Sequence, residues 1–233
     1  MLSLTDYFND PSVIALVTDR SMDFALNGRK FFLTAQQKEV LYKTGGIDID
    51  KIACCKQVHG AQVISVDKIF LESNSLLEAD GLMTADTRLP IAVRTADCLP
   101  IFIFDPDNKV ISVVHAGWRG SHRRILCRAI EQMKKSRGTS PENLKVVFGP
   151  SIRTCCYEVG QEFQEYFPRE MSRRDNKLYL DLAAVNLHQA LQCGVHKENI
   201  FDCGACTYCD ERFFSYRREG EKAGRMMSLM MLV

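Results

Sequence analysis

The chain has 233 residues, of which 46% are hydrophobic and 25% charged, so its composition is that of a globular protein and excludes intrinsic disorder and fibrous repeats. Its formal net charge of +1 provides no basic surplus, which excludes the charge pattern of a nucleic-acid-binding protein. The N-terminal residues do not read as an export signal, and no apolar run reaches the roughly 20 residues of a membrane span, so we expect a cytoplasmic protein with no membrane partner.

The first predicted helix begins after Thr34. This threonine opens a capping-box pattern, and the glycine pair at 45–46 supplies a stop, so the helix has about three turns. Two strand-like runs follow at residues 51–58 and 61–66. The turn between them contains His59, which is therefore expected at a strand end.

A β-hairpin is predicted next. Two β-rich runs, LPIFIFD and KVISVVH, flank the turn-forming sequence DPDN at 105–108. If the turn is symmetric about the bond between Pro106 and Asp107, Cys98 lies directly opposite His115 on one side of the hairpin. Their β-carbons would then be about 4.5–5.5 Å apart.

The rest of the chain alternates helices and strands. Apolar residues at helical spacing follow the glycine-rich turn after the hairpin, an aspartate can cap a second helix, and the apolar C-terminal residues read as a buried strand. The predicted ranges are 125–138 and 181–194 for the helices and 145–148, 213–216 and 226–233 for the strands. With no internal repeat and no linker, residues 1–233 are expected to form a single α/β domain.

Three residues near these elements, His59, Cys98 and His115, offer the nitrogen and sulfur donors that zinc prefers. A structural zinc usually has four protein ligands, so three donors indicate a catalytic zinc with one open position, where the pKa of bound water falls to about 7. The alternative is that each is an ordinary core or surface residue. The predicted hairpin register brings Cys98 and His115 together and so favours the metal site over the alternative. It does not say where His59 lies.

Several motifs then occur in an order that is typical of one family. They are KQVHG at 56–60, ADGLMT at 79–84, RTADC at 94–98, VHAGWRG at 114–120, GPSIRTCCYEVG at 149–160, and CTYC at 206–209 followed by FFSYRREG. Over roughly residues 50–225 the chain resembles the YfiH-like multicopper polyphenol oxidoreductase (laccase-domain) family, which is associated with purine nucleoside phosphorylase activity. The resemblance implies a layered sandwich of mixed β-sheets covered by helices.

The resemblance also implies a function. It identifies His59, Cys98 and His115 as zinc ligands. It implies phosphorolysis of adenosine, inosine, guanosine and S-methyl-5′-thioadenosine, together with adenosine deamination. The expected partners are purine nucleosides and phosphate, and a monomer is the default oligomeric state. Three alternatives stay open: a polyphenol oxidoreductase with copper in place of zinc, a peptidoglycan-precursor editing hydrolase, and a metal-stabilised binding module.

Polar residues in the same motifs are candidates for the reaction. Arg119 is the first candidate for phosphate, because a guanidinium binds phosphate through two parallel hydrogen bonds, and Arg94 is the second. Asp97, beside the cysteine donor, is expected either to exchange a proton or to orient a ligand, with a structural hydrogen bond as the alternative. Ser151 and Tyr157 are expected to contact substrate, with loop and core packing as the alternatives.

The ten cysteines are expected to be free thiols, since the chain is large and shows no export signal. Cys203, Cys206 and Cys209 form a C-x2-C-x2-C pattern, but a phenylalanine occupies the position where an iron–sulfur motif has its fourth cysteine. We therefore predict that these three, like Cys155 and Cys156, are structural thiols, with a second metal as the alternative.

Overall fold

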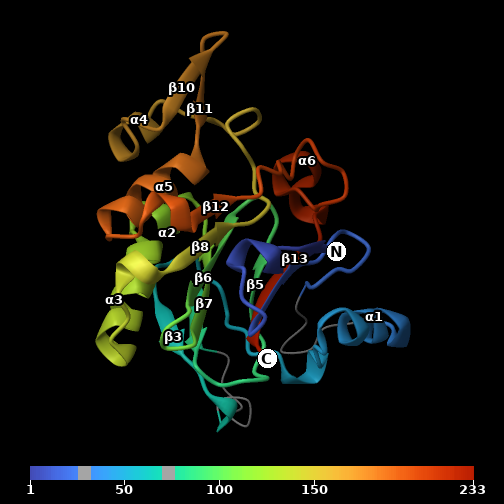
Figure 1. Cartoon of the computed structure of the whole chain (residues 1–233). Coiled ribbons are helices and arrows are strands. Elements are labelled where there is room, and N and C mark those ends of the chain that lie inside the picture. Colours follow the sequence, from blue (N-terminus) through green and yellow to red (C-terminus); the bar gives the residue numbers. More distant parts are fainter. Residues whose placement is uncertain (26–32, 70–76) are drawn as a thin grey trace.

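The computed structural model describes residues 1–25, 33–69 and 77–233. At its centre, a mixed six-stranded sheet packs against an antiparallel four-stranded sheet (Figure 1). The strands of the six-stranded sheet, in spatial order, are β12 (Ile200–Asp202), β8 (Lys145–Phe148), β6 (Leu99–Asp105), β7 (Val110–Ala116), β4 (Gly81–Thr84) and β3 (Val63–Ser65). Those of the four-stranded sheet are β1 (Leu2–Ser3), β2 (Val13–Val17), β13 (Met226–Leu232) and β5 (Ile91–Thr95).

Helices cover the outer faces of both sheets (Figure 1). On the six-stranded sheet lie α2 (Trp118–His122), α3 (Ile125–Arg137) and α5 (Leu182–Gln192), and on the four-stranded sheet lies α1 (Ala35–Gly45). Before α5, the chain forms α4 (Phe163–Tyr166) and a small sheet of β9 (Glu158–Val159), β10 (Met171–Arg174) and β11 (Lys177–Leu180). After β12, α6 (Tyr216–Glu219) precedes β13. The predicted α/β class, with mixed sheets covered by helices, is confirmed. No helix in the described ranges is long and apolar enough to cross a membrane.

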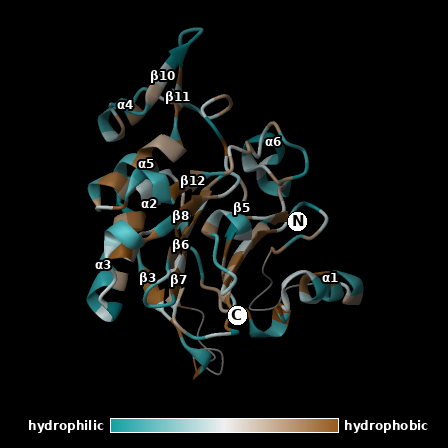
Figure 2. Cartoon of the chain, viewed as in Figure 1, coloured by the Kyte–Doolittle hydropathy of each residue, from teal (hydrophilic) through white to brown (hydrophobic). Residues whose placement is uncertain are grey.

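The hairpin of β6 and β7 separates two hydrophobic cores. On one face, Ile101 and Val114 pack with Leu126 of α3. On the other face, Phe102 and Val113 pack with the four-stranded sheet. Successive strand side chains point to opposite faces, so a strand buried on both faces is apolar throughout. Figure 2 shows these hydrophobic strands at the centre, beside helices that contain both hydrophilic and hydrophobic residues.

The predicted hairpin is confirmed, but its predicted register is wrong. Pro100, not Cys98, faces His115. The loop is wider than a symmetric two-residue turn, because the ladder ends at Asp105, whose carboxylate accepts the backbone N–H groups of residues 107–108 at 3.0 and 3.1 Å. The register is shifted by two residues, and an even shift keeps each side chain on its predicted face.

Most other predicted elements are confirmed. The helix after Thr34 is α1, begun by the predicted capping box, and the helix after Asp181 is α5, whose first turn donates to the aspartate at 2.9 Å. The helix that ends before Gly138 is α3. The strands at 145–148 and near the C-terminus are β8 and β13.

The predicted strand at 51–58 is wrong, and the predicted strand at 61–66 is reduced to β3. Of residues 51–58, only Ala53 and Lys56 form isolated bridges. The backbone N–H groups of residues 58–60 donate to the Asp80 carboxylate instead of to a neighbouring strand. A side chain thus takes the hydrogen bonds that would have extended the strand.

The predicted strand at 213–216 is also wrong. Ser215 is the N-cap of α6, and its hydroxyl accepts the backbone N–H of Arg218 at 3.2 Å. Serine is among the residues preferred at helix N-caps, and here it starts a turn of helix within a β-rich run. This turn aims the following side chains at the site described next.

Candidate active site

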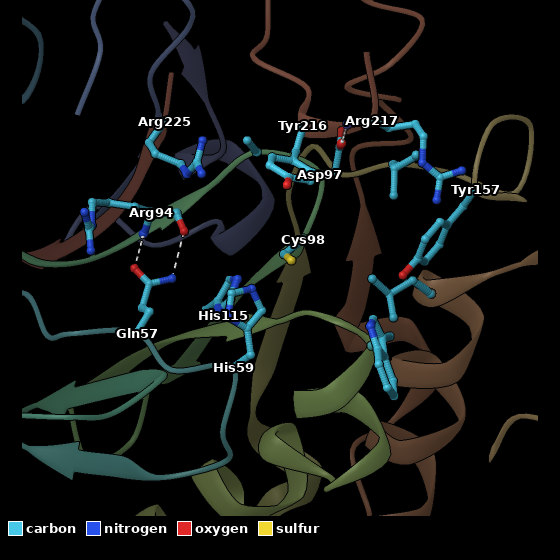
Figure 3. Close-up of a pocket in the computed structure, with 14 residues that line it drawn as sticks. Gln57, His59, Arg94, Asp97, Cys98, His115, Tyr157, Tyr216, Arg217 and Arg225 are labelled. Carbon is cyan, nitrogen blue, oxygen red and sulfur yellow. Dashed lines mark hydrogen bonds between the residues drawn. The ribbon is translucent and has the colours of Figure 1, made fainter. Parts of the chain in front are cut away.

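Three side chains with metal-binding atoms meet at one end of the central sheet. One ligand atom each from His59, Cys98 and His115 lies within 4.8 Å of the others. His115 is on β7, Cys98 immediately precedes β6, and His59 lies in the loop before β3. Figure 3 shows the three side chains close together in a pocket. The fold therefore brings together residues that are far apart in the sequence.

Asp80, just before β4, holds this group in place. Its fully buried carboxylate accepts the backbone N–H groups of residues 58–60, at 3.2, 2.9 and 2.6 Å, and faces Nδ1 of His115 at 2.9 Å. With Nδ1 engaged, Nε2 of His115 is left to face Cys98. A carboxylate that orients a histidine in this way is typical of zinc ligands. The sequence argument missed Asp80, although the motif ADGLMT contains it.

Gly117 leaves the space that the cysteine donor needs. A β-carbon at position 117 would lie 2.8 Å from Sγ of Cys98 and 3.6 Å from Cδ2 of His59. The φ of Gly117 is −72°, a value that any residue adopts. Glycine is therefore needed for space and not for backbone freedom. His59, by contrast, has a φ of 56°, in the left-handed region.

Cys98 and His115 perturb each other's protonation. Burial acts to raise the pKa of the Cys98 thiol, but His115 and His59 outweigh burial and hold this pKa well below its ordinary value. Burial acts to lower the pKa of His115, but the charges of Cys98 and Asp80 raise it above its usual range. The site thus favours a thiolate next to a positive charge, and a metal cation would meet the same negative groups.

The donor group lines a pocket of about 520 Å³, within the roughly 300–1,000 Å³ that is usual for small-molecule sites. The lining residues are Gln57, His59, Arg94, Ala96, Asp97, Cys98, His115, Trp118, Ile152, Tyr157, Leu182, Tyr216, Arg217 and Arg225. Figure 3 shows Arg94 and Arg225 on one side of the three donors and Tyr157 and Arg217 on the other. Donors, aromatic rings and cations therefore share one cavity.

Asp97 lines the pocket and anchors one of its walls. Its φ is 86°, so the backbone turns at this residue. The carboxylate accepts the hydroxyl of Thr207 at 2.6 Å, the hydroxyl of Ser215 at 3.1 Å and the backbone N–H of Arg217 at 2.6 Å. These bonds hold Tyr216 and Arg217 at the pocket. The placement agrees with a positioning role, and proton exchange stays a prediction.

Arg94 and Arg225 supply positive charge to the pocket. The backbone of Arg94 is held on both sides by the Gln57 side chain, at 2.8 Å each (Figure 3). Its buried Nε has no hydrogen-bond partner in the described part of the chain. Burial and the nearby charge of Arg225 lower the pKa of Arg94. An anion placed here would satisfy a buried donor and relieve the repulsion between two cations.

The other predicted substrate residues are placed differently. Tyr157 lines the pocket, and burial raises its pKa above the ordinary value, so its hydroxyl stays protonated. Arg119 is exposed on α2, with its guanidinium over the ring of Trp118 at 4.4 Å, and Ser151 is fully buried; neither is among the lining residues. Substrate contacts of these two residues stay predictions.

Sequence reasoning missed several residues of the pocket. Gln57, Trp118, Tyr216 and Arg217 lie inside the motifs quoted above but have side chains that are common in any protein. Arg225 lies outside all of these motifs. The four residues within the motifs could have been suggested only by their place in those motifs. Nothing in the sequence singles out Arg225.

The three remaining histidines lie away from the donors. His122 packs beside Tyr166, and His188 bonds to Glu170 at 2.8 Å. His196 follows α5 in the sequence, and its exposed ring lies near Glu198. The fold and the site thus define the class of the molecule: a mixed α/β protein with a three-donor His–Cys–His group in a small-molecule pocket.

The chain belongs to the family described as multi-copper polyphenol oxidoreductase laccase, whose model matches residues 33–233. It is 33% identical over 177 residues to a purine nucleoside phosphorylase of Borreliella burgdorferi, covering 72% of this chain and 74% of that protein. It is 33% identical over 196 residues to adenosine deaminase RL5 from an unknown prokaryotic organism, covering 77% and 74%. The crystal structure of YlmD from Geobacillus stearothermophilus matches with a TM-score of 0.83 at 25% identity, covering 95% and 92%. The predicted family is confirmed.

Proposed function

We propose that the chain is a zinc-dependent purine nucleoside phosphorylase that acts on adenosine, inosine, guanosine and S-methyl-5′-thioadenosine and also deaminates adenosine. The observation that carries the proposal is the group of His59, Cys98 and His115 in a pocket that also presents arginines. Relatives named for each of the two activities support it. A neutral nucleoside and an anionic phosphate match a pocket with both aromatic and cationic walls.

The donor set suits zinc better than a multicopper centre. Two imidazoles and a thiolate are common zinc ligands, and three protein donors leave a position open. Multicopper chemistry requires further donors, whereas His122, His188 and His196 lie elsewhere. Bound at this group, zinc would supply Lewis acidity. The chain itself contributes the orientation of the donors through Asp80.

Phosphate binding is assigned to the side of the pocket with Arg94 and Arg225. The unpartnered Nε of Arg94 can donate to a phosphate oxygen, and a guanidinium can bind two oxygens at once. The purine and ribose then occupy the side with Tyr157 and Tyr216, whose rings offer apolar faces. Asp97 holds Tyr216 there and acts as a positioning residue.

The proposed phosphorolysis joins phosphate to the sugar and releases the base. A phosphate oxygen attacks the anomeric carbon of the ribose, and the bond from this carbon to the purine nitrogen breaks. The base leaves with the electron pair and takes up a proton, which gives free purine and ribose 1-phosphate. In deamination, water replaces the amino group at C6 of adenine and ammonia is released. Arg94 and Arg225 serve only the first reaction, because only that reaction uses phosphate.

Product identification tests the proposal. The chain is incubated with adenosine in phosphate buffer and in phosphate-free buffer, and the products are separated by chromatography. Phosphorolysis yields adenine and ribose 1-phosphate only with phosphate, and deamination yields inosine in both buffers. Absence of both activities in zinc-loaded protein would refute the proposal.

The metal requirement is tested with a matched pair of histidine variants. His115→Ala removes a donor and should abolish both activities, whereas His188→Ala changes an exposed histidine paired with Glu170 and should leave both intact. Metal analysis of each protein separates zinc from copper. Full activity of His115→Ala would show that the pocket group is not the metal centre.

A further inference from the structure

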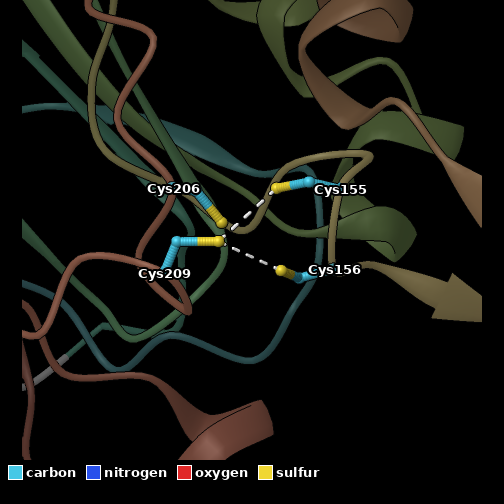
Figure 4. A group of neighbouring side chains, drawn as sticks. All are labelled: Cys155, Cys156, Cys206 and Cys209. Atoms are coloured by element: carbon cyan, nitrogen blue, oxygen red, sulfur yellow. Dashed lines mark hydrogen bonds between the residues drawn. The ribbon is translucent and has the colours of Figure 1, made fainter.

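A second group of metal-binding side chains lies outside the pocket. The sulfurs of Cys155, Cys156, Cys206 and Cys209 all lie within 4.8 Å of one another (Figure 4). We call these residues the four-cysteine cluster. All four are free thiols. The reaction proposed above uses none of them.

The spacing of these sulfurs fits a shared metal. In a tetrahedral site with zinc–sulfur bonds of about 2.3 Å, neighbouring sulfurs are about 3.8 Å apart. Sγ of Cys209 lies 3.8 Å from Sγ of Cys155 and 3.3 Å from Sγ of Cys156. A disulfide bond is only about 2.05 Å long. The four sulfurs are therefore not joined by disulfides in this structure, and their spacing is close to that of a tetrathiolate site.

Local backbone structure aims the sulfurs at one point. Cys206 and Cys209 form a C-x2-C turn, the spacing found in structural zinc sites, in which backbone N–H groups of Tyr208 and Cys209 donate to the Cys206 sulfur. Cys155 and Cys156 are adjacent, and adjacent side chains diverge on a strand. They lie instead in a turn, where the N–H groups of Cys156 and the next residue both donate to the carbonyl of Arg153 at 2.8 Å.

Backbone pairing brings the two turns together. Ser151 donates to the carbonyl of Ala205 at 3.2 Å, and Thr207 donates to the carbonyl of Ser151 at 3.1 Å. The segments 150–157 and 203–210 therefore run side by side, and the sulfurs are held near one another before any metal binds. A site arranged in advance loses less conformational entropy on binding.

The surroundings also suit a negatively charged metal centre. Four thiolates and one Zn²⁺ carry a net charge of about −2, which needs nearby positive groups. The guanidinium of Arg174 donates to the carbonyl of Cys155 at 2.8 Å, and that of Arg218 donates to the carbonyl of Tyr208 at 2.9 Å. Arg153 donates to the carbonyl of Ala205 at 3.2 Å. Arg153 and Arg218 are also paired with Asp202 and Glu219, at 2.6 Å each, which partly offsets their charge. Arg174 is therefore the cation that most directly balances the negative charge of the cluster.

We propose that the four-cysteine cluster binds a second, structural zinc ion that holds one wall of the pocket. Four protein ligands close the coordination sphere, which is typical of structural and not catalytic zinc. Cys156 is followed by Tyr157, which lines the pocket, and Cys206 is followed by Thr207, which donates to Asp97 at 2.6 Å. The site does not depend on which reaction the pocket performs.

Metal analysis of single-cysteine variants tests this proposal. Cys206→Ser and Cys209→Ser should each lose one equivalent of zinc relative to the natural chain. Cys203→Ser is the matched control, because this residue shares the C-x2-C-x2-C pattern but lies outside the cluster. Equal zinc content in all three variants would overturn the proposal, as would iron in place of zinc or an intact-protein mass showing a disulfide.

Cobalt substitution gives a second measurement that does not require a cluster variant to fold. Co²⁺ in a tetrathiolate site produces intense thiolate-to-cobalt absorption. We expect this absorption in Cys98→Ser and Cys203→Ser, which keep the cluster intact, and its loss in Cys206→Ser. If Cys98→Ser shows no tetrathiolate spectrum with Co²⁺, the cluster does not bind the metal and the proposal fails.

Discussion

Asp80→Asn probes how the donor group of the pocket is held. Oδ1 of Asp80 is 2.9 Å from both the backbone N–H of His59 and Nδ1 of His115. Oδ2 accepts the backbone N–H groups of Val58 at 3.2 Å and Gly60 at 2.6 Å. An asparagine has one oxygen and one NH2 group, so its nitrogen faces two of these partners in either orientation.

Both orientations of the asparagine are unfavourable. With the NH2 group at Oδ2, the bonds from Val58 and Gly60 are both lost, and at about 1.5–3 kcal/mol each they cost roughly 3–6 kcal/mol out of a typical total stability of about 5–15 kcal/mol. With the NH2 group at Oδ1, the bond from His59 is lost, which costs about 1.5–3 kcal/mol. If the NH2 group replaces Oδ1, it donates to Nδ1 of His115, and the ring proton moves to Nε2, which then has no free lone pair for a metal. We expect zinc affinity at the pocket to fall by about 10–100-fold.

The assay is competition for zinc with a chromophoric chelator, carried out in a Cys206→Ser background so that only the pocket site contributes. Asp105→Asn is the matched control, since Asp105 is also buried and hydrogen-bonded but lies at the opposite end of the hairpin. Its partners at Oδ2, the Asn108 amide and the Thr139 hydroxyl, can both turn to accept a hydrogen bond. The control should keep its zinc affinity. Unchanged zinc affinity in Asp80→Asn would refute the orienting role of Asp80.

Three further predictions concern space, phosphate and pH. Gly117→Ala places a β-carbon 2.8 Å from Sγ of Cys98 at an unstrained φ of −72°, so the zinc of the pocket and both activities should be lost while the melting temperature changes little. Zinc content equal to that of the natural chain would contradict the spatial argument. Arg94→Lys keeps the charge but loses the planar fork, so the KM for phosphate should rise about 10–100-fold with adenosine deamination nearly unchanged. Arg119→Lys tests the first phosphate candidate of the sequence: if Arg94 binds phosphate, this variant should change neither the KM for phosphate nor the deamination rate, and the reverse pattern would move phosphate binding to Arg119. Burial acts to raise the pKa of Asp105, but its hydrogen bonds outweigh burial and lower it, so its stabilising effect is present above about pH 4 and is lost as pH falls through the folded pKa. The melting temperature of the natural chain should therefore fall more steeply below about pH 4 than that of Asp105→Asn, and parallel curves would exclude this contribution.

The hairpin shows how far sequence reasoning reaches. The alternation of β-rich runs and the turn sequence predicted its strands and the shared face of Cys98 and His115. Its register could not be predicted, because the side chain of Asp105 accepts N–H groups within the turn and widens the loop. The predicted face of each side chain was nevertheless right, since a shift of two residues keeps every side chain on the same face of the sheet.

The four-cysteine cluster shows where such reasoning ends. The C-x2-C-x2-C pattern suggested three related cysteines, whereas the structure groups two of them with the pair at 155–156 and leaves Cys203 outside. The cluster forms because Ser151 pairs with the backbone near Cys206. No spacing in the sequence encodes a contact between segments some fifty residues apart.

The sequence by itself determined the types of the metal-binding residues, most of the helices and strands, and the family, because donor chemistry, periodicity and capping are local properties. Only the tertiary structure decided which carboxylate orients His115 and which arginines face the pocket. It also decided which cysteines share a centre. Each of these depends on backbone hydrogen bonds and sheet packing that join distant segments, and these contacts form only when the whole chain has folded.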